Sequence, residues 1–376
     1  MEFYFDNAAT TMVCREAADI AYKVMTEFYG NPSSTHTKGR EAKAVLDTAR
    51  KQVADALGCT PAEVYFTSCG SEGDNWAIIN GAESMKRKGL HIISSTVEHD
   101  AVRKSLDELE SRGFEVTRLA PEADGSVSVD AVKAALREDT VLVTLMMVNN
   151  ETGAVTDIAA IAKLLKAKKS QALLHTDAVQ GFMKVPFTAK RLGADMITIS
   201  GHKIHAPKGI GALYIKTGCK IKPYIRGGAQ ESGLRAGTEA MPQIAAFGKA
   251  CEEAHKKINE SIASMSALRE LAISRICDDM PEAVVIGGGS PHILSISLPG
   301  WRSEVLMNFL EAKGVFVSRS SACKKGGRSH VLEAIGLSAP VIDGAIRISF
   351  SRFTTADDIN ALCAALKEAH DSLAHR

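Results

Sequence analysis

Residues 196–215 read MITISGHKIHAPKGIGALYI and place a lysine between two apolar runs that are typical of buried strands. The first run is Met196 to Ile199 and the second is Gly211 to Ile215, with Ser200-Gly201-His202-Lys203 directly after the first. A lysine taken by itself is most simply a surface residue, but polar residues flanked by two apolar strands are poorly placed for a surface. A buried lysine has a depressed pKa and can act as a nucleophile and a base. Lys203 is therefore the leading catalytic candidate.

Strand-like and helix-like segments alternate on both sides of this stretch. The strands expected in the first two-thirds of the chain are 64–67, 91–95, 141–148, 173–175, 196–199 and 211–215, and the helices are 75–88, 101–111 and about 157–169. This alternation predicts an α/β fold with a mostly parallel sheet covered on both faces. A helix-rich region from about 239 to 280 then leads into a smaller α+β domain. Its expected strands are 284–286, 293–298, 315–317 and 346–350, and its helices are 303–312 and 356–374.

Length and composition limit the classes of protein to consider. With 376 residues the chain is long enough for two domains, and 45% hydrophobic and 24% charged residues are ordinary for a globular protein. A formal net charge of +1 argues against a nucleic-acid partner. No apolar run is long enough to span a membrane, and no secretory signal is evident at the start. None of the eight cysteines forms a CxxC pair, which favours reduced thiols in the cytoplasm and no metal site.

Polar residues recur just after the ends of the predicted strands. They are Ser68–Ser71, His99, Asn149-Asn150, Asp177 and Lys203. In open parallel sheets ligands bind beyond the carboxyl ends of the strands, where loops lead into helices. The pattern therefore predicts one binding site at this edge of the sheet.

Lys203 and Asp177 together suggest a cofactor. A lysine amine condenses with an aldehyde, and a carboxylate can hold a pyridinium nitrogen protonated, which are the two groups that a protein supplies to pyridoxal phosphate (PLP). An aspartate after a strand is also a common helix N-cap, so both interpretations of Asp177 stand. His99 also has two interpretations, because it could cap a helix or stack on a planar cofactor.

Two further segments are rich in small residues and could bind a phosphate. Gly70 and Ser71 lie in a strand-to-helix turn, and Thr238 ends the glycine-rich stretch 227–238. Backbone N–H groups at a helix start favour phosphate, but each segment could equally be a structural turn.

Cys323 and Arg347 are the chemical groups of the second domain. Cys323 follows a predicted strand and is surrounded by serine, glycine and basic residues, which lower the pKa of a thiol and favour the thiolate. The other seven cysteines read as small buried hydrophobes. Arg347 lies inside an apolar strand and needs an anionic partner. That partner could be a substrate carboxylate or an internal carboxylate.

The order of these motifs resembles that of the cysteine desulfurases, which are fold-type I PLP enzymes of the class V aminotransferase group. The motifs that carry the resemblance are Phe5-Asp6-Asn7-Ala8-Ala9-Thr10-Thr11, Gly30-Asn31-Pro32-Ser33-Ser34, Glu98-His99, Asn149-Asn150-Glu151-Thr152-Gly153, Asp177-Ala178-Val179-Gln180, Ser200-Gly201-His202-Lys203, Arg235-Ala236-Gly237-Thr238, Ser321-Ala322-Cys323 and Arg347 to Thr355. The resemblance implies a large PLP-binding domain, residues 16–244, with a mostly parallel seven-stranded sheet. It also implies a small α+β domain, residues 1–15 and 245–376, that carries the catalytic cysteine loop.

The same resemblance implies a role for each candidate residue. Lys203 holds PLP and later takes the substrate Cα proton, Asp177 pairs with the ring nitrogen, and Gln180 hydrogen-bonds the ring oxygen. His99 stacks on the ring and assists proton transfer. The residues expected to hold the phosphate are Gly70, Ser71, Ser200 and His202, with Thr238 from the second subunit of a homodimer. Asn150 contacts the cofactor and, with Arg347, orients the substrate carboxylate. Cys323 takes the sulfur of L-cysteine as a persulfide, and alanine is released.

The chain departs from the family pattern in two places. Cys69 is unusual in the phosphate loop, and the residues after Cys323 are more basic and slightly shorter than in long-loop members. Selenocysteine lyase, another class V aminotransferase or lyase, and a non-catalytic sulfur-carrier scaffold are the alternatives to a desulfurase. The sulfur acceptor is expected to be a protein that serves iron–sulfur cluster assembly or thiolation, and the sequence does not identify it.

Overall fold

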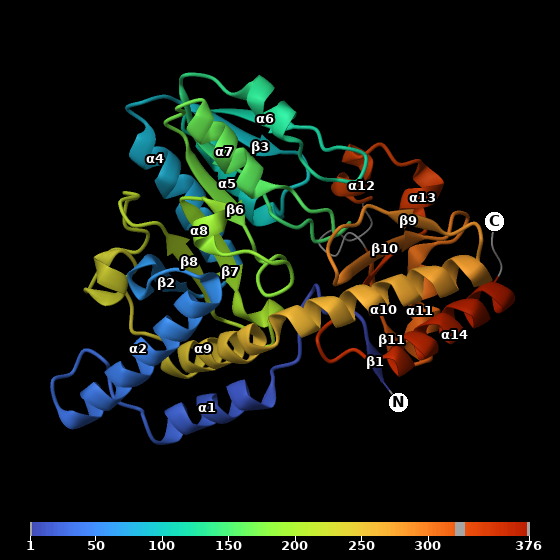
Figure 1. Ribbon diagram of the computed structural model, residues 1–376, viewed down its shortest axis with the longest axis horizontal. Coiled ribbons are helices and arrows are strands. Elements are labelled where there is room, and N and C mark those ends of the chain that lie inside the picture. Colours follow the sequence, from blue (N-terminus) through green and yellow to red (C-terminus); the bar gives the residue numbers. More distant parts are fainter. Residues whose placement is uncertain (1, 320–327, 374–376) are drawn as a thin grey trace.

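The computed structural model describes residues 2–319 and 328–373, and it contains two main sheets (Figure 1). The larger sheet has seven strands in the order β2-β8-β7-β6-β5-β3-β4. Their bounds are β2 Val64–Thr67, β3 His91–Ser95, β4 Glu115–Leu119, β5 Thr140–Thr144, β6 Leu173–Asp177, β7 Met196–Ser200 and β8 Gly211–Ile215.

The direction of the strands follows from the lengths of their connections. Strands β3 to β7 pair in parallel, whereas β8 is antiparallel to both β7 and β2. The short link from Gly201 to Ile210 between β7 and β8 holds only a single helical turn, and a parallel return needs a crossover of a dozen or more residues. The prediction of an α/β fold with a mostly parallel sheet of seven strands is confirmed.

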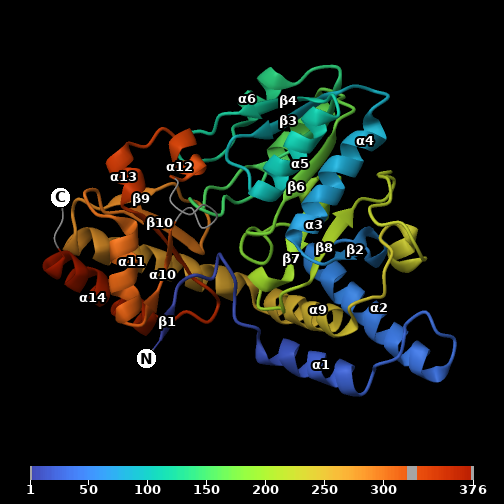
Figure 2. The same cartoon turned by 180° about the vertical axis from the view of Figure 1, so that it is seen from behind.

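Helices cover both faces of this sheet (Figures 1 and 2). Helices α3 Gly70–Asn75, α4 Gly81–Met85 and α5 Asp100–Ser111 lie on the face that Figure 2 presents, and α6 Val129–Ala135 and α7 Ile158–Ala167 lie on the other. Neighbouring strand residues point to opposite faces: Ile92 packs in the core beneath α5, and Ile93 packs in the core that contains residues of α7. This alternation explains why the strands are apolar throughout.

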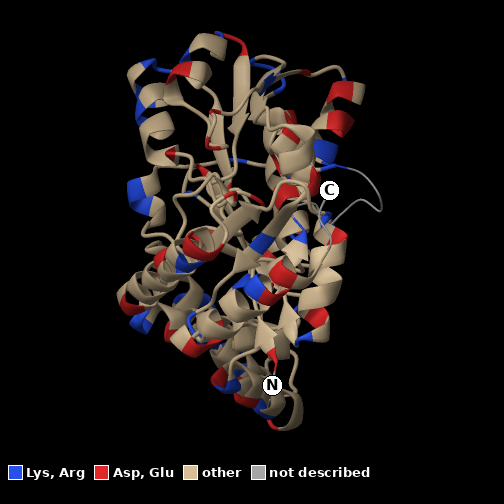
Figure 3. Ribbon diagram, turned by 90° about the vertical axis from the view of Figure 1, so that its right-hand side faces the viewer, with Lys and Arg blue, Asp and Glu red and all other residues tan. Residues whose placement is uncertain are grey.

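Four further helices and four short helical turns belong to the same half of the molecule as the large sheet. The helices are α1 Arg15–Thr26, α2 Thr37–Leu57, α8 Ala189–Leu192 and α9 Met241–Lys256, the 3₁₀ turns are η1 Pro61–Glu63, η3 Gly201–Lys203 and η4 Gln230–Gly233, and η2 Trp76–Asn80 is a π-helical turn. Figure 3 shows acidic and basic residues interspersed on the side that it presents, in keeping with the net charge of +1.

A second core forms around a smaller antiparallel sheet. Its order is β12-β13-β10-β9, with β9 Val284–Ile286, β10 Ile293–Ser297, β12 Ser318–Arg319 and β13 Ala345–Ser349. A short parallel pair, β1 Phe3–Tyr4 with β11 Val315–Phe316, brings the start of the chain to this region. The helices here are α10 Ile258–Asp279, α11 Ser303–Ala312, α12 His330–Ala334, α13 Ala339–Asp343 and α14 Ala356–Ser372. The domain boundaries at residues 15 and 244 stay predictions.

Several elements differ from the sequence prediction. Helices α1, α2 and α6 and strand β4 were missed; β4 lies at the sheet edge and is polar, with Glu115 exposed. The helix predicted from Asn75 begins at Gly70 in the structure. Its first turn consists of glycine and polar residues with weak helix propensity, which is why the prediction placed the start too late. The strand predicted to reach Val148 ends at Thr144; after it, the N–H groups of Leu145 and Met147 still donate to β6, and Met146 and Val148 line the cavity at this edge.

The search for membrane-spanning segments gives a negative result over the residues that the structure describes. No helix there combines the length and the apolar composition needed to cross a bilayer.

Candidate active site at the carboxyl edge of the sheet

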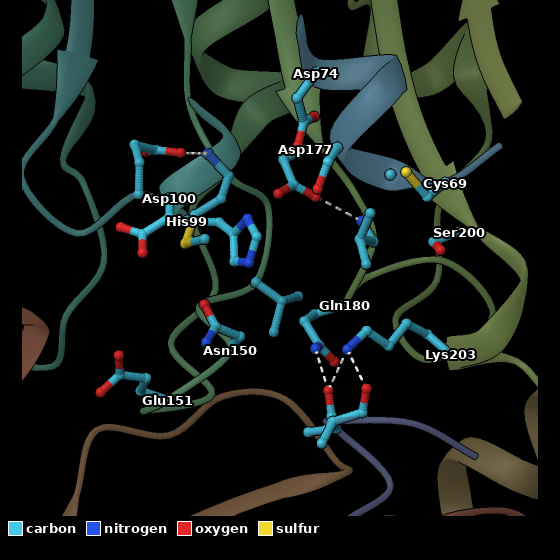
Figure 4. Close-up of a pocket in the computed structure, with 18 of the residues that line it drawn as sticks. Cys69, Asp74, His99, Asp100, Asn150, Glu151, Asp177, Gln180, Ser200 and Lys203 are labelled. Carbon is cyan, nitrogen blue, oxygen red and sulfur yellow. Dashed lines mark hydrogen bonds between the residues drawn. The ribbon is translucent and has the colours of Figure 1, made fainter. Parts of the chain in front are cut away.

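A cavity of about 370 Å³ lies at the carboxyl ends of β5, β6 and β7 (Figure 4). Its volume falls in the usual range for small-molecule sites. It is lined by most of the residues predicted from the sequence, namely Gly70, Ser71, His99, Asn150, Asp177, Gln180, Ser200, His202, Lys203 and Arg347. Two predicted residues are not among them. Thr238 is exposed and does not line the cavity, and Cys323 lies outside the described residues.

Strand register brings Asp177 and Lys203 together. Asp177 is the last residue of β6 and pairs with Thr198 of β7, while Lys203 ends the 3₁₀ turn that follows β7. The carboxylate of Asp177 accepts a hydrogen bond from the N–H of Val179 at 2.9 Å, which makes an Asx turn rather than a helix cap. Burial raises the pKa of Asp177, whereas the positive charges of His99 and Lys203 act to lower it. A cationic partner in the cavity would favour the ionised form.

The N-terminal segment crosses the site and holds the amine of Lys203. Lys203 Nζ donates to the carbonyl oxygens of Ala8 at 2.6 Å and Ala9 at 2.7 Å. Gln180 Nε2 donates to the same Ala8 oxygen at 2.8 Å (Figure 4). Thr11 donates from its N–H and its hydroxyl to the carbonyl of His202, at 2.9 and 3.0 Å. The first residues of the chain are therefore part of the site's wall.

His99 combines the two interpretations that the sequence left open. It is the N-cap of α5, where its Nδ1 accepts from the N–H of Ala101 at 3.2 Å. Its ring also faces the cavity beside Asp177, as Figure 4 shows. Because Nδ1 accepts, a neutral ring carries its proton on Nε2. This leaves Nε2 as the nitrogen available to donate into the cavity.

The wall formed by the start of α3 and the turn that carries Lys203 fits a phosphate. Gly70 begins α3, and a Cβ atom there would lie 2.8 Å from Val179 Cγ2, so the close approach requires glycine. The hydroxyl of Ser200 is buried and has no hydrogen-bond partner among the described residues. Burial lowers the pKa of His202 to about 4, so its ring is a neutral group at this wall. An unpaired hydroxyl beside free backbone N–H groups fits the phosphate of PLP.

Arg347 has the internal carboxylate partner that was one of its two expected partners. Its side chain is 3% exposed, and its Nη2 donates to Asp6 at 2.9 Å, so an internal ion pair exists. Its Nη1 donates to the backbone oxygen of Asn150 at 2.7 Å. It also lines the cavity, and its buried Nε has no partner in the described structure. The role of Arg347 and Asn150 in binding a substrate carboxylate stays a prediction.

Three buried carboxyl groups of the cavity wall were missed by the sequence analysis. Asp74 lies beside Asp177 in Figure 4, and burial and the charge of Asp177 raise its pKa well above the usual value. Burial also raises the pKa of Glu98 to about 8 and that of Glu151 to about 7. Glu98 precedes His99 and Glu151 follows Asn150, and adjacency to a predicted site residue is the only signal that the sequence offered.

Two residues after the Cys323 segment reach the same cavity and were also missed. Arg328 and His330 line it, and His330 Nε2 lies 3.3 Å from the backbone oxygen of Glu98. Ser329 donates a hydrogen bond from its hydroxyl to the carboxyl group of Glu151. On the other flank, Ser318 pairs with Arg347 across the small sheet. Both described flanks of the segment 320–327 therefore lie beside the cavity.

The loop that carries Thr238 is attached to the phosphate wall. Arg235 Nε donates to Glu72 of α3 at 2.8 Å, and this pair is mostly buried. Glu72 also accepts from the N–H of Ser68 at 2.8 Å. The loop thus packs on the start of α3 in its own chain, while Thr238 itself is exposed and does not line the cavity.

Comparison with known proteins decides the family. The model of the aminotransferase class-V family matches residues 3–362. The chain belongs to the class-V aminotransferase family. Members of this family use PLP, and the residues around the cavity fit that cofactor as described above.

Characterised members of the family are similar over nearly the whole chain. Cysteine desulfurase IscS of Methanosarcina thermophila is 41% identical over 97% of this chain and 91% of its own length. A cysteine desulfurase of Trichormus azollae is 40% identical over 98% of this chain and 93% of its own length. Among solved structures, a NifS-like protein superposes with a TM-score of 0.93 at 35% identity, covering 99% of this chain and 100% of its own. The structure of SspA in complex with cysteine has a TM-score of 0.82 at 32% identity and covers 94% and 100% of the two chains.

Glu98 predicts a pH dependence of stability. Its pKa is raised by burial from 4.5 to about 8, so between these values the unfolded chain releases a proton that the folded chain keeps. The free energy of unfolding therefore falls as pH rises through this window, by at most about 1.4 kcal/mol per pH unit. In Glu98→Gln this loss disappears, and the variant gains stability relative to wild type from pH 5 to 8 in denaturant unfolding. Glu108→Gln, exposed on α5, is the control and keeps the wild-type slope. A Glu98→Gln slope equal to that of wild type contradicts a proton held on Glu98.

Proposed function

We propose that this protein is a PLP-dependent cysteine desulfurase that converts L-cysteine to L-alanine and transfers the sulfur to Cys323 as a persulfide. The observation that carries the proposal is that Lys203, Asp177 and Arg347 converge on one cavity from distant parts of the chain. An amine, a carboxylate and a guanidinium are the groups needed for an aldehyde cofactor, its ring nitrogen and an amino-acid carboxylate. The similarity to cysteine desulfurases over more than nine-tenths of the chain supports this assignment.

The cofactor would be held by residues of the large sheet's carboxyl edge. Lys203 would bind it covalently, Asp177 would pair with the ring nitrogen, and Gly70, Ser71, Ser200 and His202 would hold the phosphate. PLP supplies an electron-withdrawing ring that stabilises negative charge at the substrate Cα. Gln180, whose amide Nε2 donates to Ala8 in this structure, would donate to the ring oxygen of the bound cofactor.

Proton transfer falls to Lys203 and His99. When the amine of Lys203 is not bound to the cofactor, it donates to the carbonyls of Ala8 and Ala9 and stays within the cavity, where it can take a proton from the substrate Cα. His99 is fixed by its contact with Ala101, so its Nε2 presents a constant direction to the ring. Arg347 would donate a hydrogen bond to the substrate carboxylate from its Nε, which has no partner in the described structure, while Asp6 holds the guanidinium in place.

Sulfur transfer is assigned to Cys323. Its thiolate attacks the sulfur of the bound cysteine, the carbon–sulfur bond of the substrate breaks, and a sulfur–sulfur bond forms on Cys323. The electron pair of the broken bond stays with the substrate carbon, which takes up the proton that Cys323 lost on becoming a thiolate and becomes the methyl group of alanine, so no external oxidant or reductant is needed. Both described flanks of the segment lie beside the cavity, as Ser318 and Ser329 show, which supports access of Cys323 to the substrate.

Replacing Cys323 tests this reaction. We expect Cys323→Ala to abolish release of alanine and sulfide from L-cysteine, assayed with a reductant, while the visible absorbance of bound PLP remains. Cys219→Ala is the control, because burial raises the pKa of Cys219 to about 11 and keeps it a protonated thiol. Equal activity in wild type and Cys323→Ala would contradict the role of Cys323. Activity on selenocysteine alone would favour a selenocysteine lyase.

We also infer that the protein acts as a homodimer and passes its sulfur to an acceptor protein. Thr238 is exposed outside its own chain's cavity, which is the position expected of a residue that completes a partner's site. The side chains of Tyr22, Met25 and Tyr29 are exposed by more than half on and after α1, and an apolar surface of this kind favours association. Seven cysteines are free thiols in the described structure, which supports a reducing compartment such as the cytoplasm.

A mixed dimer tests whether Thr238 acts on the partner's site. A dimer of one Lys203→Ala chain and one Thr238→Ala chain would contain one intact site if Thr238 acts across the interface. We expect this hybrid to bind PLP at one of its two sites with wild-type affinity, measured by absorbance titration. The Thr238→Ala homodimer is the comparison and binds PLP more weakly at both sites. A hybrid that behaves like the Thr238→Ala chain shows that Thr238 acts within its own chain.

A further inference from the structure

A second lysine, Lys184, lies in the interior behind Lys203. It belongs to the turn that follows β6, and the preceding residue, Met183, has a φ of 59°, in the left-handed region that non-glycine residues seldom adopt. The side chain of Lys184 is 5% exposed, and its Nζ has no hydrogen-bond partner among the described residues. Burying an unpaired amine is unfavourable, so such a group calls for a functional explanation.

The surroundings of Lys184 are positive or neutral. Burial, together with the charges of Lys203 and Arg347, lowers its pKa to about 7. The neighbouring ionisable groups from other elements are His202, His205, His292 and Arg352. Burial lowers the pKa of each of the three histidines, so they stay neutral at neutral pH. Among the described residues, the groups that these contacts and charges place around the Lys184 amine are cations and neutral rings.

A small cavity connects the two lysines. It has a volume of about 20 Å³, and both Lys184 and Lys203 line it, together with polar groups such as Ser261 and Ser351. A space of this size holds one water molecule when its wall is polar. The two lysines therefore border a common small space, and a proton on either amine disfavours a proton on the other.

We propose that Lys184 is a positioning residue for Lys203: in its protonated state its charge disfavours protonation of the Lys203 amine and keeps that amine reactive toward the PLP aldehyde. The proposal rests on the proposed function, because it assumes that Lys203 binds PLP. In that step the neutral nitrogen of Lys203 bonds to the aldehyde carbon, the aldehyde oxygen leaves as water, and no redox change occurs. Only the unprotonated amine reacts, so a neighbouring cation increases the reactive fraction at neutral pH.

The test is the pH dependence of PLP loading. The full-length chain is freed of PLP by dialysis, PLP is added back between pH 6 and 9, and covalent loading is followed by absorbance. We expect Lys184→Met to slow loading by up to roughly tenfold between pH 6 and 7, where the wild-type Lys184 amine carries a charge, and to leave loading near pH 9 unchanged. Lys184→Arg keeps the charge and is expected to keep the wild-type profile. Lys190→Met, exposed nearby, is the surface control.

The outcomes separate this inference from the proposed function. If the wild type loads PLP and the pH profile of Lys184→Met coincides with that of the wild type, the role of Lys184 is overturned and the desulfurase proposal stays intact. A wild-type chain that does not load PLP at Lys203 overturns the proposed function itself. If Lys184→Met does not fold, as judged by circular dichroism, Lys184→Gln is measured in its place with the same expected slowing. Slowing in Lys184→Arg as large as in the neutral variants would show that packing, not charge, is responsible.

Discussion

The parallel pairing of β5, β6 and β7 is the constraint on which the rest of the site depends. In parallel strands all carboxyl ends meet at one edge, so the turns after them converge without any further device. Asp177 at the end of β6, Lys203 in the turn after β7 and Asn150 in the turn after β5 are brought together in this way. The strands are buried on both faces, which fixes their register and therefore the relative positions of these side chains.

The N-terminal segment then joins this edge to the second sheet. Its backbone oxygens at Ala8 and Ala9 accept from Lys203, and its Asp6 carboxylate accepts from Arg347 of β13. The same segment pairs through Phe5 and Asn7 with Ser349 at the end of that strand. The group expected to bind the cofactor and the group expected to bind the substrate carboxylate are therefore held by one short stretch of backbone. Residues separated by more than 140 positions in sequence form a single cavity as a result.

The sequence was most informative where a local pattern and a chemical requirement coincide. The apolar run Met196–Ile199 and the similar runs before and after it predicted the fold class. The polar residues that follow these runs predicted which edge of the sheet carries the cavity. The buried carboxyl groups Asp74 and Glu98 could not be found in this way, because their burial depends on packing between α3, α5 and the turn after β5. That Asp6 is the carboxylate partner of Arg347 could not be predicted either, since the two residues meet only through contacts between the two ends of the chain. Lys184 reads in the sequence as one lysine among many, and its lack of a partner is visible only in three dimensions.

The central claim is that Lys203 binds PLP in the cavity at the carboxyl edge of the sheet. The most direct measurement is borohydride reduction of the holoenzyme, which makes the lysine–PLP bond permanent, followed by peptide mass spectrometry. The account predicts the added mass of PLP on Lys203 and none on Lys184, although both lysines line the same small space. Label on Lys184 or on any other lysine, or no label on a protein that carries PLP absorbance, would contradict it.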